Sequence, residues 1–252
     1  MSRLRSLLAL LLGGLILAGA PPQRAAEAEL VADLSDHLVA ITTGFAGTEV
    51  LLFGAVERAG EVVVTVRGPT VPITMRRKSR IAGIWMNTAS MTFERAPSFY
   101  AVSSSGRLDE IATESVRQRH AMGTDHLELP LAPAKASPNV AQEWRNALVR
   151  AKQRQELYAR DVGRVTFLGA RLFRTKIFFP ANVPTGSYQV DTYLLRDGRV
   201  VSAQTTPLIV SKVGVEAELY QFAHQQAAAY GLVAIVIALL AGWGGYALFR
   251  KA

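Results

Sequence analysis

The sequence of 252 residues contains no cysteine. This absence excludes disulfide bridges, thiolate zinc sites, iron–sulfur clusters and cysteine nucleophiles. Histidine is scarce too: the chain has four, His37, His120, His126 and His224. None forms the close pairs, such as H-x3-H or H-E-x-x-H, that are typical of zinc sites, because His120 and His126 stand six positions apart. The sequence therefore predicts no metal site.

Two motifs that carry common enzyme chemistry are also missing. There is no G-x-S-x-G turn for acyl transfer and no G-x-x-x-x-G-K-[ST] loop for phosphate binding. The serine run Ser103–Ser105, followed by Gly106, is more typical of the end of a strand. We therefore predict no catalytic residue and no cofactor, and we interpret the chain as a protein that is not an enzyme.

The composition indicates a folded protein, because 50% of the residues are hydrophobic and 19% are charged. The formal net charge is +8, but part of the excess lies at the two ends of the chain. The basic residues there are Arg3, Arg5, Arg24, Arg250 and Lys251. Such flanks are typical of targeting and anchoring segments, and no interleaved aromatic residues suggest base stacking. Nucleic acid is therefore not an expected partner.

The first segment, residues 1–28, has the pattern of a secretory signal peptide. Arg3 and Arg5 precede an apolar stretch from Leu7 to Ala20, which is too short to span a bilayer. Cleavage after Ala28, at an A-x-A site, is the preferred prediction, and cleavage after Ala20 is the alternative. An uncleaved N-terminal anchor is the other interpretation.

Residues 227–249 form a run of 23 residues without charge, long enough for a transmembrane helix. Arg250 and Lys251 follow at once, and positive residues favour the cytoplasmic side. We therefore expect an inner-membrane protein with a single span, a cytoplasmic tail at 250–252 and a periplasmic domain at 29–212. A juxtamembrane helix is expected at 213–226. A buried core helix is the alternative for 227–249.

Between residues 30 and 213 the pattern is mostly strand-like. Short β-branched runs alternate with turn residues, which is typical of a β-sandwich, and Val183–Val190 favours an immunoglobulin-like form. The sequence Arg196-Asp197-Gly198-Arg199 predicts a tight hairpin turn. The expected strands lie at 30–34, 37–43, 48–56, 61–69, 72–75, 80–88, 90–104, 165–180, 186–206 and 207–213.

Residues of about 107–160 form a predicted helical insertion into this sandwich; two separate domains are the alternative. Asn139 is expected to cap the longest helix, with Gln142 in the capping-box position. Trp144 and Leu148 recur on one side of that helix and are expected to face the sheet.

Two groups of residues are candidates for binding. Arg76, Arg77, Lys78 and Arg80 form the densest basic cluster, which could bind a small anion, lipid headgroups or an acidic partner, or protect an edge strand from aggregation. If this segment is extended, Arg77 points away from the other three. In the apolar helix, Ala234, Ala238, Gly242 and Gly245 form a set of small residues suited to helix–helix packing.

Several longer segments carry a resemblance to a known family. They are VADLSDHLVAITTGFAGTEVLLFGA, RRKSRIAGIWMN, FPANVPTGSYQVDTYLLRDG and TTPLIVSKVGVEAELYQFAH. With them the chain resembles an alphaproteobacterial family of transmembrane proteins of unknown function. The resemblance implies a single-pass envelope protein and, as a partner, another membrane protein such as a sulfite-exporter-type permease. The expected function is that of a membrane-anchored accessory protein, and a periplasmic module that binds a small anion through the basic cluster is the alternative. An envelope enzyme is a distant third interpretation.

Overall fold

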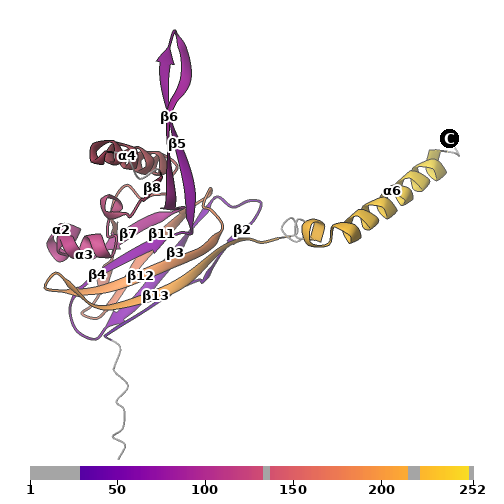
Figure 1. Ribbon diagram of the computed structural model, residues 1–252. Coiled ribbons are helices and arrows are strands. Elements are labelled where there is room, and N and C mark those ends of the chain that lie inside the picture. Colours follow the sequence, from indigo (N-terminus) through magenta and orange to yellow (C-terminus); the bar gives the residue numbers. More distant parts are fainter. Residues whose placement is uncertain (1–28, 133–136, 215–221, 250–252) are drawn as a thin grey trace, which may run out of the picture.

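The computed structural model describes residues 29–132, 137–214 and 222–249. Its strands form three sheets, and the long helix α6 (Ala227–Phe249) follows them (Figure 1). The prediction of a mainly β chain with one C-terminal apolar helix is therefore confirmed. The predicted signal peptide, the predicted tail at 250–252 and part of the predicted juxtamembrane helix lie outside the described residues.

The first sheet has four antiparallel strands in the order β1-β3-β11-β10. They are β1 (Leu30–Leu34), β3 (Gly47–Val56), β10 (Thr166–Leu168) and β11 (Leu172–Pro180). Buried and exposed residues alternate along β11, as they do along β1. Because side chains alternate between the two faces of a strand, this period of two buries one face of the sheet.

The second sheet has six strands in the order β2-β13-β12-β4-β7-β9. They are β2 (Leu38–Ile41), β4 (Glu61–Arg67), β7 (Tyr100–Ser104), β9 (Gly163–Arg164), β12 (Gly186–Arg196) and β13 (Arg199–Lys212). The predicted turn between β12 and β13 is confirmed, because Arg196 pairs with Arg199 and both central residues, Asp197 and Gly198, have positive φ, at 49° and 73°.

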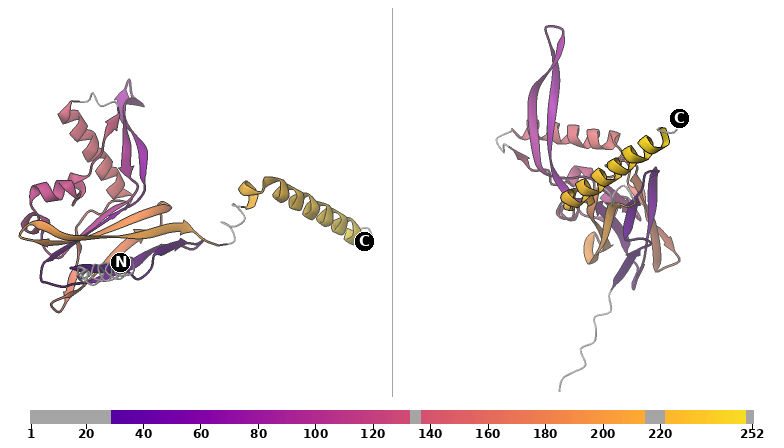
Figure 2. Two further views of the ribbon diagram at one scale, coloured as in Figure 1. Left: turned by 60° about the horizontal axis from the view of Figure 1, so that its bottom comes forward. Right: turned by 90° about the vertical axis from the view of Figure 1, so that its right-hand side faces the viewer.

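These two sheets lie one against the other and enclose the core (Figures 1 and 2). Three aromatic rings meet in it: the ring centroid of Phe99 lies 5.2 Å from that of Phe179, and Tyr188 lies 5.8 Å from each. The strand orders are compatible with the predicted immunoglobulin-like sandwich, and that narrower assignment stays a prediction.

The insertion between β7 and β9 contains four helical segments. They are α2 (Leu108–Ile111), α3 (Glu114–Arg119), the 3-10 helix η1 (Thr124–His126) and α4 (Pro138–Arg154). The hydroxyl of Tyr100 donates to the Ala121 carbonyl at 2.6 Å and accepts from the Gly123 N–H at 2.7 Å. Since these bonds hold the insertion on the sheet, β4 is buried on both faces rather than one.

The expected cap of α4 is wrong. Ser137, not Asn139, occupies the N-cap position, and the helix begins at Pro138. Proline suits the first turn because it has no N–H to satisfy there, and it holds the residue before it extended. Gln142 donates to Asn146 on the next turn, instead of completing a capping box. Trp144 and Leu148 are buried, as expected for the inner side of this helix. That this side faces the sandwich stays a prediction.

The third sheet consists of β5 (Thr70–Ile81), β6 (Ile84–Pro97) and β8 (Leu131–Ala132). Here the expectation of one strand over 80–88 is wrong, because a turn at Ala82 and Gly83 divides that segment into the ends of two strands. The two strands form one long hairpin that projects away from the other sheets (Figures 1 and 2). The expected strand over 165–180 is divided in the same way, into β10 and β11.

Candidate interaction surface: the β5–β6 hairpin

The hairpin closes through a two-residue turn. Ala82 and Gly83 both lie in the left-handed region, with φ of 47° and 87°, between the paired residues Ile81 and Ile84. Positive φ at both central positions is the geometry that fits the twist of two antiparallel strands. The twelve residues of β5 rise by about 3.3 Å each, so that the strand is about 40 Å long. The hairpin therefore holds its tip well away from its base.

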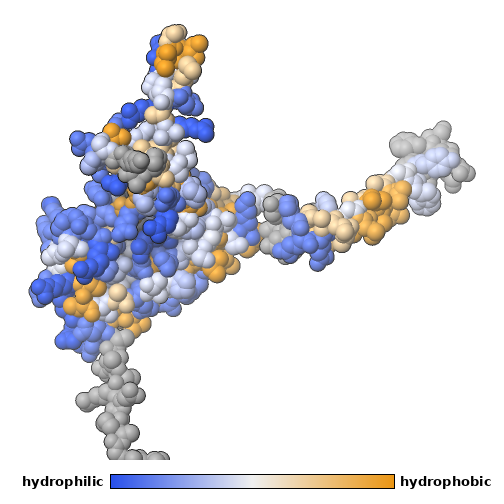
Figure 3. All heavy atoms as spheres, in the orientation of Figure 1, coloured by the Kyte–Doolittle hydropathy of each residue, from blue (hydrophilic) through white to orange (hydrophobic). Residues whose placement is uncertain are grey.

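The tip of the hairpin is apolar and exposed (Figure 3). Its large side chains are Ile81, Ile84, Trp85 and Met86, and they are 51%, 67%, 67% and 52% exposed. Single exposed apolar residues are common on protein surfaces, whereas a group of four at the end of one element is typical of a contact with another protein or a membrane. We call these four residues the apolar tip.

Over residues 70–93 the charge of the hairpin has one sign. Residues 70–93 contain Arg76, Arg77, Lys78 and Arg80 and neither aspartate nor glutamate. Two of the four basic groups, Arg77 and Arg80, have partners of their own. Arg77 faces α4, where it pairs with Glu143 at 2.7 Å and lies over the ring of Trp144 at 5.1 Å. Arg80 donates from Nε to the Gly83 carbonyl at 3.1 Å. The segment is thus a basic stem rather than a closed anion site.

The Arg77 contacts predict a measurable role for α4 in holding the stem. We expect Arg77→Ala to speed hydrogen exchange of the β5 and β6 amides between residues 76 and 90. The loss of global stability should stay near 1 kcal/mol, because an exposed ion pair and an exposed cation–π contact each contribute about 0.2–1 kcal/mol. Arg76→Ala is the matched control, since Arg76 has no ion pair within the described chain. Equal exchange rates in the two variants would contradict the role of α4.

The predicted packing face of α6 is exposed as well. No residue of the stretch Ala227–Gly244 is buried, and Ala234, Ala238 and Gly242 lie on it at intervals of four. Gly245 belongs to the part of the helix whose side chains are not described. Helix–helix packing through these residues stays a prediction.

The histidines take part in structural contacts. The ring of His120 lies 4.7 Å from that of Tyr193, and Nδ1 of His126 lies 3.6 Å from the Glu114 carboxylate. Within residues 29–132, 137–214 and 222–249, no group of three histidine, aspartate or glutamate side chains could hold a metal ion.

A mainly β domain followed by one exposed apolar helix, long enough to cross a bilayer, has the organisation of a single-span membrane protein. The chain belongs to the family described as "Putative transmembrane protein (Alph_Pro_TM)", whose match covers residues 29–251. The family resemblance seen in the sequence is thereby confirmed. Neither the curated proteins nor the solved structures contain a match.

The apolar tip is the part of the candidate site that sequence reasoning missed. A single strand over 80–88, as the sequence predicts, leaves no turn between Ile81 and Ile84. The available signal was Ala82-Gly83, a small residue and a glycine between two apolar pairs. It is weaker than the Asp-Gly pair at 197–198, because alanine rarely adopts positive φ.

Proposed function

We propose that the protein is an accessory protein of the bacterial envelope. In this proposal α6 anchors it in the inner membrane, the β domain lies in the periplasm, and the β5–β6 hairpin rests its apolar tip in the bilayer surface. Two attachments fix the orientation of a domain, whereas a single helix leaves it free to rotate. A domain held in this way can stand beside a neighbouring membrane protein, such as an anion permease of the sulfite-exporter type.

The observation that carries the proposal is the combination of an apolar tip with a stem that is basic and free of acidic residues. Tryptophan favours the level of the lipid headgroups, and basic side chains favour anionic lipids. A groove in a protein partner could also accept an apolar tip. It would not by itself account for four positive charges, in residues 70–93, without one negative charge.

The magnitudes indicate which part of the hairpin matters most. Complete burial of one large apolar side chain contributes about 1.5–3 kcal/mol, and one basic residue near an anionic surface contributes about 1 kcal/mol. Insertion of the tip therefore depends first on residues such as Ile84 and Trp85. The stem residues Arg76 and Lys78 determine the preference for anionic lipid.

The cysteine-free sequence makes this proposal simple to test. The full chain carrying Ile84→Cys is labelled with the environment-sensitive dye NBD and reconstituted into phosphatidylcholine liposomes with and without phosphatidylglycerol. We expect blue-shifted emission and strong quenching by lipids that carry a shallow nitroxide, with larger effects when phosphatidylglycerol is present. Thr185→Cys, exposed in the loop between β11 and β12, is the matched control and should report water.

The outcomes separate the two parts of the proposal. If the NBD label at the tip is exposed to water in liposomes but shielded in native membranes, the tip docks on a protein. The proposed lipid contact is then wrong, and the accessory role is supported. A tip that reports water in both settings contradicts the proposal as a whole. Adding Trp85→Ser to the labelled chain should reduce the quenching, whereas Arg76→Gln should reduce only its dependence on phosphatidylglycerol.

A further inference from the structure

We infer that the protein has a separate binding site for a small oxyanion, at the base of the hairpin and independent of the apolar tip. A pocket of about 290 Å³ lies there between the second sheet, the hairpin and the insertion. Three arginines line it, each from a different element: Arg67 from the end of β4, Arg95 from β6 and Arg119 from the end of α3. They are 24 or more positions apart in sequence, and only the fold brings them to one pocket.

Arg67 is the deepest of the three and its position is fixed. Its side chain is 34% exposed and pairs with Asp191, whose carboxylate also accepts a bond from the Thr205 hydroxyl at 2.6 Å. Burial opposes the charge of Arg67, but the hydrogen bond and the charge of Asp191 outweigh it, so that the pKa of the guanidinium is raised. The group thus stays charged, and its Nε is buried with no hydrogen-bond partner among the described residues.

The other two arginines leave the pocket with excess positive charge. Within the described part of the chain, neither Arg95 nor Arg119 forms an ion pair, and Glu128 is the one acidic residue of the pocket lining. The positive charge also affects the neighbouring His120. Its pKa is lowered first by burial and then by the charges of Arg119 and Arg67. The charge of the pocket therefore favours the binding of a negative ligand and opposes the binding of a positive one.

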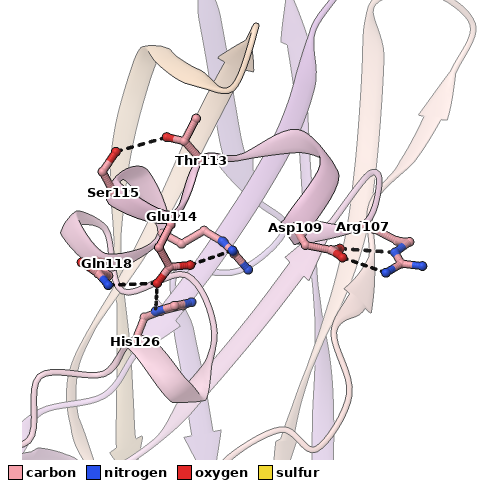
Figure 4. A network of polar contacts seen from close by, with 8 residues as sticks. Arg107, Asp109, Thr113, Glu114, Ser115, Gln118 and His126 are labelled. Carbon is pink, nitrogen blue, oxygen red and sulfur yellow. Dashed lines mark hydrogen bonds and ion pairs between the residues drawn. The ribbon is translucent and has the colours of Figure 1, made fainter.

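The wall that carries Arg119 is held in place before any ligand binds. Glu114, at the start of α3, accepts from Arg117 at 2.7 Å and from Gln118 at 2.9 Å, and His126 lies 3.6 Å away (Figure 4). The two hydrogen bonds of Tyr100 fasten the segment that follows α3 to the sheet. Because these groups are already ordered, a ligand would not have to pay the conformational entropy of arranging them.

The chemistry of the lining selects the class of ligand. Guanidinium groups bind oxyanions through pairs of parallel hydrogen bonds, and three of them suit a tetrahedral oxyanion or a short dicarboxylate. A ligand that reaches all three arginines would contact the sheet, the hairpin and the insertion together. It would therefore stiffen the base from which the hairpin projects.

The test is a titration of the full chain in detergent micelles with inorganic phosphate, sulfate and succinate, at constant ionic strength maintained with chloride. Binding is followed as the rise in melting temperature and by calorimetry. We expect a saturable effect from at least one of the three anions. Arg95→Gln and Arg119→Gln should each weaken that affinity by about tenfold or more, as expected for the loss of a charged hydrogen bond. Both arginines are exposed, so these variants should fold.

Arg76→Gln is the matched control, because it removes the same charge from the stem and leaves the pocket intact. It should bind as the unchanged protein does. An equal loss of affinity in Arg76→Gln would place the anion on the stem cluster and overturn the inference. The absence of any effect beyond that of chloride would also overturn it. Neither result would alter the NBD signal of the tip, so this inference and the proposed function fail separately.

Discussion

Replacing Asp191 by alanine is expected to lower the free energy of unfolding of the β domain by about 3–5 kcal/mol. The Asp191 side chain is 8% exposed and lies against Arg67, which would keep its charge after the substitution. Removing the carboxylate destabilises the domain by more than the ion pair contributes, because the desolvation of the partly buried guanidinium is then no longer compensated. Urea unfolding of the full chain in micelles, followed by tryptophan fluorescence, measures the change.

A second substitution shows whether the unpaired charge is the cause. Adding Arg67→Met to Asp191→Ala removes the guanidinium and keeps most of the aliphatic part of the side chain. Much of the lost stability should therefore return. Thr205→Val is a further comparison, since it removes one hydrogen bond to Asp191 and should cost about 0.5–1.5 kcal/mol, or somewhat more because the acceptor is charged. A double variant no more stable than Asp191→Ala would show that packing, not charge, determines the effect.

The Arg67–Asp191 pair also shows where sequence reasoning stops. The two residues are 124 positions apart, and their contact follows from the pairing of β4 with β12. Residue types indicate that Arg67 ends an apolar run, but not which acid lies opposite. The pocket arginines are hidden for the same reason, since Arg95 and Arg119 lie on different elements. The basic cluster is visible in the sequence only because its members lie within five successive positions.

Local sequence patterns predict individual strands and turns, but they do not show every surface that becomes buried. The sequence predicts a strand over 61–69 but not that both of its faces are buried, as Val63 and Thr65 on one face and Val62, Val64 and Val66 on the other are. The second burial depends on the insertion, and the sequence showed that helices were present there without showing which surface they cover. The sequence predicts the Asp-Gly turn at 197–198 because those residues accept positive φ, but not the turn at Ala82-Gly83, because alanine rarely adopts it.

The proposed role of α6 as the anchor leads to the other prediction with a large effect. Replacing Ile235 and Leu239 by arginine places two charges at the centre of the helix, at a cost to membrane insertion of about 2.5–3.5 kcal/mol each. We expect this variant to be released from membranes by alkaline carbonate. A core helix of a soluble protein would respond with a loss of fold, and the exposure of Ala227–Gly244 argues against that origin of its apolar character.

The matched control moves the same two charges to the end of the helix. Ala228→Arg with Ala229→Arg places them near the first turn of α6, where long basic side chains can reach the interface, so this variant should stay embedded. Dependence on depth is the property of a membrane span, because a charge costs most at the middle of the hydrocarbon layer. Mass spectrometry of the mature chain completes the test. If a chain that starts at residue 29 stays in the membrane with arginine at 235 and 239, α6 is not the anchor and the hairpin tip must supply the attachment.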